Sequence, residues 1–445
     1  MALGAMCAAF WLAPAAEALV WSPPVVVTRS PDASRFALAV NTRGEQVVVW
    51  EETRQVSPPP RYRARTTVRA RVRAPGGRFR PVQRLRRSTA AILPDIAIAR
   101  DGTAIAAWNR VFRGHYRIFA AVRRPGRRFG RPVQIGRTDK AQGAAPQVEF
   151  DHRGNAIVLW RWSDRLQWAY RARGHGFRTA RTIRVGKAAL RVPAQEKFLT
   201  FDRRGNAYVA LASRGRQRRT AGGDVTTIVE GGVFLATRRP GGRFGRPRRV
   251  SPAGVPASRP EAAVSPDGTI VVVWRAAPTP GTEDMWGPIR ALTIGADGTR
   301  TLRTLSADRP GAGTDPHVQF TRAGTAVAVW RQGHVDPPAG QFGWVEVAAS
   351  VGAGGAFGAP VVLSPAGVET ERGFVAATDR DDAVVTWEQL VGGRNAVVAL
   401  TRDPSGGLSP AQELAVAPSS AVVHADGHVV VLLRTEAGPR LVNGR

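Results

Sequence analysis

The chain alternates between short apolar runs and polar turns, and one version of this pattern recurs along its whole length. Its clearest copy runs from Pro94 to Trp108, where an alternating apolar run meets Asp-Gly and a second apolar run ends on tryptophan. Apolar residues on both sides of such a turn predict a β-hairpin. A Trp or Leu follows six residues after the turn position in eight copies, which turn at Gly44, Gly102, Gly154, Gly205, Gly268, Gly324, Asp381 and Gly427.

A second motif follows most of these hairpins and predicts another turn. It is rich in Pro, Gly, Arg and Phe, and it lies between two further apolar runs in segments 75–82, 125–133, 240–247 and 354–361. Each repeat therefore predicts four strands. The turn positions lie 46 to 63 residues apart, which suits the blades of a β-propeller. No stretch has a sustained helical period, so we expect an all-β protein.

The two ends of the chain predict how the ring closes. Segment 24–28 resembles the fourth strand of a blade that lacks its first three, and the C-terminal repeat supplies three strands ending near Val442. A ring also avoids the exposed edges that an open stack of sheets would leave. We therefore predict one β-propeller over residues 19–445 with eight four-stranded blades, the N-terminal strand completing the last. Seven blades is the alternative if the degenerate last copy packs elsewhere.

These repeats resemble those of secreted proteins from high-GC Gram-positive bacteria, which are built from Pro-x-x-Ala-x-Asp-x-x-Gly-x-Ala-x-x-x-Trp units. The resemblance covers residues of about 24 to 442. It implies a propeller repeat and assigns no activity, since the function of that family is largely unassigned and a propeller hosts many functions.

The first 18 residues resemble a signal peptide. A short apolar stretch up to Leu12 precedes a small-x-small site at Ala16 to Ala18, and the chain's single cysteine, Cys7, lies within it. We therefore expect a secreted or envelope-associated protein whose mature form lacks cysteine. Nothing after this segment is apolar for long enough to form a membrane helix.

The net charge of +30 is concentrated in one half of the chain. Residues 251–445 carry a net −4, from 15 Arg against 19 Asp and Glu, so the first 250 residues carry +34. Arginine outnumbers lysine 61 to 3, which compositional bias explains for the residue type but not for its placement. An anionic polysaccharide or an envelope protein is the expected partner. Nucleic acid is disfavoured because no recognition motif is present.

One face of the propeller is the expected binding face. The connections between the second and third strands vary in length, whereas the tight turns on the other face are uniform. The residue after each terminal Trp or Leu should lie at this variable face. These positions are Glu51, Asn109, Arg161, Arg275, Arg331, Glu388 and Arg434, with Trp286 and Trp344 as candidate stacking residues. Pairing between blades is the alternative interpretation of these charges.

Catalytic and metal-binding motifs are absent from the sequence. There is no nucleophile elbow, phosphate loop or calcium loop, and the seven histidines show no metal spacing. We therefore expect no cofactor and no metal. The primary hypothesis is a monomeric, exported, non-catalytic binding or scaffold module for anionic glycans or envelope components. The alternative is a carbohydrate-active hydrolase or lyase that uses carboxylates of the variable face, such as Glu51 and Glu388.

Overall fold

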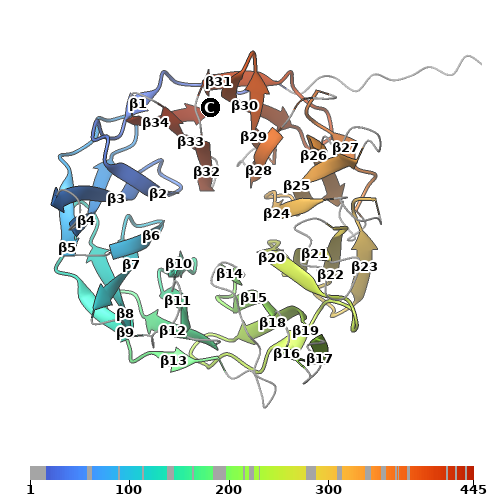
Figure 1. Cartoon of the computed structure of the whole chain (residues 1–445), viewed down its shortest axis with the longest axis horizontal. Coiled ribbons are helices and arrows are strands. Elements are labelled where there is room, and N and C mark those ends of the chain that lie inside the picture. The colour runs from blue at the N-terminus through green and yellow to red at the C-terminus, as the bar shows by residue number, and fades with distance from the viewer. Residues whose placement is uncertain are drawn as a thin grey trace, which may run out of the picture.

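The protein is a closed ring of β-sheets. The computed structural model describes residues 17–57, 63–88, 91–112, 115–137, 145–162, 165–183, 197–213, 216–219, 225–229, 231–276, 287–307, 313–335, 342–351, 357–365, 368, 370–377, 381–416, 419–425, 428–435 and 438–444. Within these ranges eight four-stranded antiparallel sheets surround one axis (Figure 1). The predicted all-β propeller is confirmed, and it has eight blades. No helix in this part of the chain could span a membrane.

In each blade the first strand lies nearest the axis and the last lies at the rim (Figure 1). Blade 1 contains β2 (Ala33–Val40), β3 (Gln46–Ser57), β4 (Arg63–Arg73) and β5 (Gln83–Ser88). Blade 2 contains β6 (Ala91–Ile98), β7 (Ala104–Phe112), β8 (His115–Arg123) and β9 (Val133–Arg137). Blade 3 contains β10 (Gln147–Phe150), β11 (Ala156–Trp162), β12 (Arg165–Arg171) and β13 (Arg181–Thr182). Blade 4 contains β14 (Lys197–Phe201), β15 (Ala207–Ser213), β18 (Gly232–Arg238) and β19 (Arg248–Arg249).

The remaining blades repeat this order. Blade 5 contains β20 (Ala257–Val264), β21 (Ile270–Ala276), β22 (Ile289–Ile294) and β23 (Arg300–Thr304). Blade 6 contains β24 (Thr314–Phe320), β25 (Ala326–Val335), β26 (Phe342–Val351) and β27 (Val361–Val362). Blade 7 contains β28 (Thr370–Ala377), β29 (Ala383–Val391), β30 (Arg394–Arg402) and β31 (Gln412–Val416). Blade 8 combines β1 (Val25–Val26) with β32 (Ser419–Ala425), β33 (His428–Thr435) and β34 (Gly438–Gly444). An insertion in blade 4 forms a separate hairpin of β16 (Arg216–Arg219) and β17 (Val225–Val229).

The inner hairpins turn as the repeated glycine predicts. Gly102 has a φ of 89°, and its N–H donates to the Ala99 carbonyl at 2.9 Å. The Ala99 N–H in turn donates to the Thr103 carbonyl at 2.8 Å. A turn followed by one left-handed residue closes a hairpin in this way, and glycine adopts that conformation without a steric penalty. In blade 7, Asp381 takes the left-handed position with a φ of 67°.

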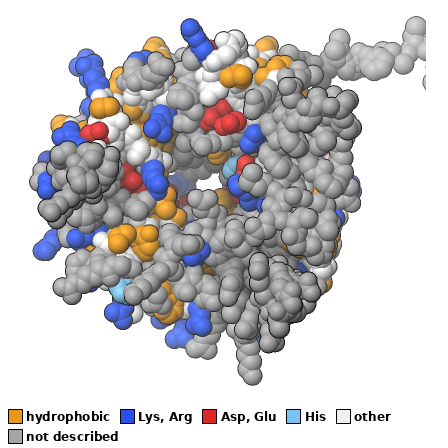
Figure 2. All heavy atoms as spheres, viewed as in Figure 1, with side chains coloured by type: hydrophobic (Ala, Val, Ile, Leu, Met, Phe, Trp, Pro, Cys, Tyr) orange, Lys and Arg blue, Asp and Glu red, His pale blue; other side chains and the backbone are white. Residues whose placement is uncertain are grey.

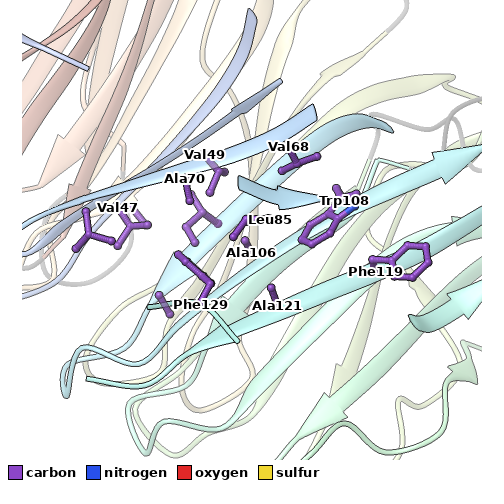
Figure 3. Close-up of a cluster of buried hydrophobic side chains, with 14 residues drawn as sticks. Val47, Val49, Val68, Ala70, Leu85, Ala106, Trp108, Phe119, Ala121 and Phe129 are labelled. Atoms are coloured by element: carbon purple, nitrogen blue, oxygen red, sulfur yellow. The ribbon is translucent and has the colours of Figure 1, made fainter. Parts of the chain in front are cut away.

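The second strand of each blade is buried on both faces, because each sheet packs between two neighbours. Trp108 is fully buried and belongs to the cluster that joins blades 1 and 2, together with Val49 and Val68 (Figure 3). Ile105 lies on the opposite face of the same sheet and packs against blade 3. Two buried faces explain why these strands read as continuous apolar runs rather than as a strict alternation. Trp108 therefore lies between two adjacent blades.

The N-terminal strand closes the ring. Val25 pairs with Leu441 and Val26 with Arg440, and the Val27 N–H donates to the Pro439 carbonyl at 2.8 Å. The predicted completion of the last blade is therefore confirmed. Most of the predicted signal peptide, residues 1–16, lies outside the described residues, so this segment stays a prediction.

Candidate functional site

The residues predicted at the variable face make several contacts between strands. Glu51 is almost fully buried and accepts a hydrogen bond from the Leu93 N–H of the next blade. Burial raises the pKa of Glu51, although the Leu93 hydrogen bond and Arg35 oppose the shift. Arg331 donates to the Thr370 carbonyl of the next blade at 2.7 Å. These two contacts join neighbouring blades through backbone groups.

The other predicted site residues differ in exposure. Asn109 and Glu388 are buried, Arg161 and Arg275 are half-buried, and Arg434 is exposed. Arg275 donates to Ser258 Oγ within its own blade, at 3.0 Å from Nε and 2.6 Å from Nη2. Trp286 and the Trp344 side chain lie outside the described residues. The proposed ring of ligand-binding residues therefore stays a prediction.

A second set of polar residues lies on the innermost strands. One position recurs seven residues before each turn position, and it holds Ala37, Asp95, Gln147, Phe198, Glu261, His317 and Phe374 in blades 1 to 7. Asp95, Gln147 and Glu261 each accept a backbone N–H of the next innermost strand. Asp95 Oδ2 accepts the Val148 N–H at 2.7 Å, and Gln147 Oε1 accepts the Leu199 N–H at 3.0 Å. Polar side chains are thus held in fixed positions around the axis.

The innermost strands begin with a β-bulge in several blades. Arg35, Leu93, Arg259 and Asp315 occupy this bulge with φ between 47° and 59°. A bulge redirects side chains and commonly lies at a rim or beside a site, and left-handed non-glycine residues store backbone strain. Here the bulges of blades 5 and 6 bring together Arg259 and Asp315, which form an ion pair. The start of the innermost strands is therefore charged as well as strained.

A group of titratable side chains joins blades 2, 3 and 4. Burial raises the pKa of Asp95 to about 6, against the opposing effects of two backbone N–H groups and Lys197. Burial and the negative charge of Asp95 raise the pKa of Glu149 to about 8. Burial lowers the pKa of Lys197 to about 8, with Asp95 opposing and Arg161 adding to the shift. At neutral pH the site thus holds one ionised and one protonated carboxyl group beside two cations. We call Asp95, Glu149, Lys197 and Arg161 the carboxyl cluster.

The opposite arc of the ring carries a histidine–carboxylate pair. His317 Nδ1 lies 2.8 Å from Glu261 Oε2, and Glu261 Oε1 accepts the Val318 N–H at 3.2 Å. The Phe374 ring lies 4.9 Å from the imidazole, centre to centre. Burial alone lowers the pKa of His317, but Glu261 and Asp315 outweigh it and the net pKa is raised.

This pair yields a first prediction. Glu261→Gln is expected to lower the pKa of His317, because the main opposing charge is lost. A raised histidine pKa stabilises the fold fully below the ordinary value of about 6.5, and the contribution disappears as pH rises through the folded pKa. The variant should therefore lose more stability at pH 5.5 than at pH 8.5. Imidazole NMR titration and melting curves at both pH values measure this, and an unchanged pKa would contradict the pairing.

The innermost strands surround an opening at the centre of the ring. Figure 2 shows this opening, with acidic, basic and histidine side chains around it. Among the described residues no three His, Cys, Asp or Glu side chains are grouped as a metal ion requires. From the sequence we considered the residues that follow the tryptophans, and we did not identify the polar residues seven positions before each turn, on the innermost strands. Polar residues at a position where other repeats have Ala or Phe were the available signal.

Comparison with known proteins identifies no family for the chain. No protein-family model and no curated protein matches it. Among solved structures it is similar to polysaccharide lyase Uly1, with 10% identity, 96% of this chain and 99% of that chain covered, and a TM-score of 0.49. It is also similar to an α-L-arabinofuranosidase of Fusarium graminearum, with 12% identity, coverage of 88% and 99%, and a TM-score of 0.42. A Dyadobacter fermentans protein of unknown function has 13% identity, coverage of 74% and 96%, and a TM-score of 0.40. The resemblance to secreted repeat proteins stays a prediction.

Proposed function

We propose that the protein is a glycoside hydrolase that cleaves an anionic polysaccharide at the central opening of the ring. The observation that carries the proposal is the carboxyl cluster. Asp95 and Glu149 lie on neighbouring innermost strands, and the Val148 N–H fixes the Asp95 carboxylate. Their pKa values of about 6 and about 8 separate their protonation states at neutral pH. Two carboxyl groups with separated pKa values are the usual acid–base pair of glycosidases.

The two carboxyl groups have complementary roles in this proposal. Glu149 donates its proton to the glycosidic oxygen as the C–O bond breaks, so the leaving sugar departs as an alcohol. The ionised Asp95 takes a proton from the water that attacks the anomeric carbon, or attacks that carbon itself. Its hydrogen bond to Val148 fixes its orientation before substrate arrives. The stereochemistry of the product distinguishes the two routes.

The cations of the cluster define the substrate class. Lys197 and Arg161 lie close enough to each other for the Arg161 charge to lower the lysine pKa. Two cations beside an acid–base pair favour a sugar with its own negative charge, such as a uronate, because arginine pairs with carboxylate through two parallel hydrogen bonds. The proposed hydrolase corresponds to the alternative in the sequence analysis, with Asp95 and Glu149 in place of Glu51 and Glu388.

The pH dependence of activity tests this assignment. We expect kcat/KM to follow a bell-shaped curve, because Asp95 must be ionised and Glu149 protonated. The limbs should lie near pH 6 and pH 8, with the maximum between them. Release of reducing ends from polygalacturonate, alginate and hyaluronan provides the measurement. A rate that keeps rising above pH 8.5 would contradict Glu149 as the acid.

Two other outcomes would assign a different function. Products with an unsaturated uronate at the new end, detected by ultraviolet absorbance, would identify a lyase. Salt-sensitive binding with no cleavage of any polymer would identify the non-catalytic binding module that the sequence also suggested.

We also propose that the protein is exported and cleaved after Ala18. Leu19 packs into a cluster with Ala376 and Val384 of blade 7, so cleavage at this point would retain a residue that the ring buries. N-terminal sequencing of the protein from its native host tests this.

A further inference from the structure

A cationic groove separates the outer parts of blades 2 and 3. It has a volume of about 1380 Å³ and runs between β8 and β9 on one side and β12 with its following turn on the other. Among the described residues its lining contains no Asp or Glu. It contains Arg124, Arg127, Arg128, Arg131, Arg137, Arg171 and Arg178. Seven like charges along one groove are unfavourable without an anionic partner.

One of these arginines differs from its counterparts in the other blades. The last residue of the third strand is arginine in blades 1, 2, 3, 4 and 7, and in three of them its Nε donates to a carbonyl of the following turn. In blade 2, Arg123 Nε donates to the Arg127 carbonyl at 2.9 Å, and its other nitrogens reach Gly102 and Glu45. Arginine at this position therefore normally binds within the protein.

Arg171, the blade 3 counterpart, is 6% exposed and lines the groove. Within the described part of the chain, its Nε and Nη1 atoms have no hydrogen-bond partner. Unpaired N–H groups on a buried cation are costly, and a carboxylate or sulfate would supply the missing acceptors. Burial also lowers the pKa of Arg171, and Arg124 adds to that effect while Asp101 opposes it. The cations of the groove thus lie within range of one another.

We propose that this groove binds an anionic polysaccharide, with Arg171 at its base and the exposed arginines along its walls. The proposal rests on the proposed function, because the groove would hold a second stretch of the substrate that the carboxyl cluster cleaves. Sugar carboxylates or sulfates spaced along an extended chain match arginines spaced along a groove. Single-stranded nucleic acid is less well matched, since it relies on exposed rings for stacking. Of the aromatic rings in the described lining, those of Trp162 and Phe177 are half-buried, and only that of His175 is exposed.

The test compares two triple variants that remove the same charge. Arg124→Gln/Arg128→Gln/Arg131→Gln alters only exposed groove residues, and Arg300→Gln/Arg303→Gln/Arg322→Gln alters exposed residues of blades 5 and 6. Fluorescence anisotropy measures binding of labelled oligogalacturonate and heparin oligosaccharide, in a Glu149→Gln background so that the probe survives. The groove variant should bind about 30-fold more weakly, roughly threefold for each arginine, and the control should change by less than threefold.

Further measurements separate this proposal from the proposed function. Arg171→Met should weaken binding in the same direction as the triple variant. Equal losses of affinity in the groove and control variants would refute the groove as the polysaccharide site. Tighter binding of single-stranded DNA than of either oligosaccharide would also refute it. Reducing-end release by the groove variant on short and long substrates provides the second readout. If the groove variant binds more weakly than its control but the wild-type protein cleaves no polymer, the hydrolase proposal is refuted and the groove proposal stands. If the wild-type protein cleaves a polymer but the groove variant binds it as tightly as the control does, the groove proposal is refuted and the hydrolase proposal stands.

Discussion

Glu149→Gln is expected to reduce turnover by about 10³-fold while leaving polysaccharide binding nearly unchanged. Glutamine has the size and hydrogen-bonding capacity of protonated glutamic acid but cannot transfer a proton, and general acid catalysis contributes about 10² to 10⁴ in rate. The loss should therefore fall on kcat rather than on KM. Reducing-end assays and anisotropy measure the two quantities. Glu413→Gln, which alters an exposed carboxylate on the outer strand β31, is the matched control.

The same variant should change stability in a pH-dependent direction. The pKa of Glu149 is raised to about 8 in the folded protein, so its contribution is most favourable below about 4.5 and is lost as pH rises through 8. Glutamine does not titrate, and the variant should gain stability relative to wild type at pH 8.5, by up to about 5 kcal/mol at 1.36 kcal/mol for each pKa unit. At pH 5 the two melting temperatures should nearly agree. A variant that is inactive and less stable at both pH values would indicate a structural role.

The architecture follows from the sequence because it depends on repeated local chemistry. The turn at Gly102, the apolar run that ends at Trp108 and the unpaired strand before Thr28 each have one plausible structural consequence, and the ring contains all three. Eight copies also reinforce one another, so an irregular copy such as the Asp381 turn is still assigned to the correct place.

The site follows from departures from the repeat, which are harder to recognise in a single sequence. Asp95 and Glu261 occupy strand positions that hold Ala37 and Phe374 elsewhere, and nothing local shows that these positions surround the axis. The β-bulges are also invisible in the pattern, since residues as different as Leu93 and Asp315 adopt the left-handed conformation. Tertiary constraint from the neighbouring blades imposes that conformation.

The groove illustrates the same limit for charge. Arg171 belongs to a recurring arginine position. Only the structure distinguishes it from Arg123, whose guanidinium nitrogens have hydrogen-bond partners. The excess charge of the first 250 residues could be counted from the sequence, but its concentration between two particular blades could not. The composition therefore shows which half of the chain carries the positive charge, and the packing of blades 2 and 3 shows where that charge lines a groove.

Val27→Asp is expected to open the ring. Val27 is fully buried among Leu38, Trp50 and Leu441, where the N-terminal segment holds blade 8 against blade 1. A carboxylate forced among these apolar side chains should lower the free energy of unfolding by about 3 to 5 kcal/mol, even though Arg71 donates to the Val27 carbonyl at 2.6 Å.

Val20→Asp provides the matched control, since Val20 is 76% exposed in the same segment and should tolerate the charge. Urea unfolding gives the free energies, and limited proteolysis shows whether the N-terminal segment is released first. Among the described strands β1 pairs with β34 alone, so its loss leaves blade 8 with three strands and a free edge, and an exposed edge promotes association. The Val27 variant should therefore also aggregate at concentrations where the Val20 variant stays monodisperse. Equal unfolding midpoints for the two variants would show that closure by β1 contributes little to the stability of the ring.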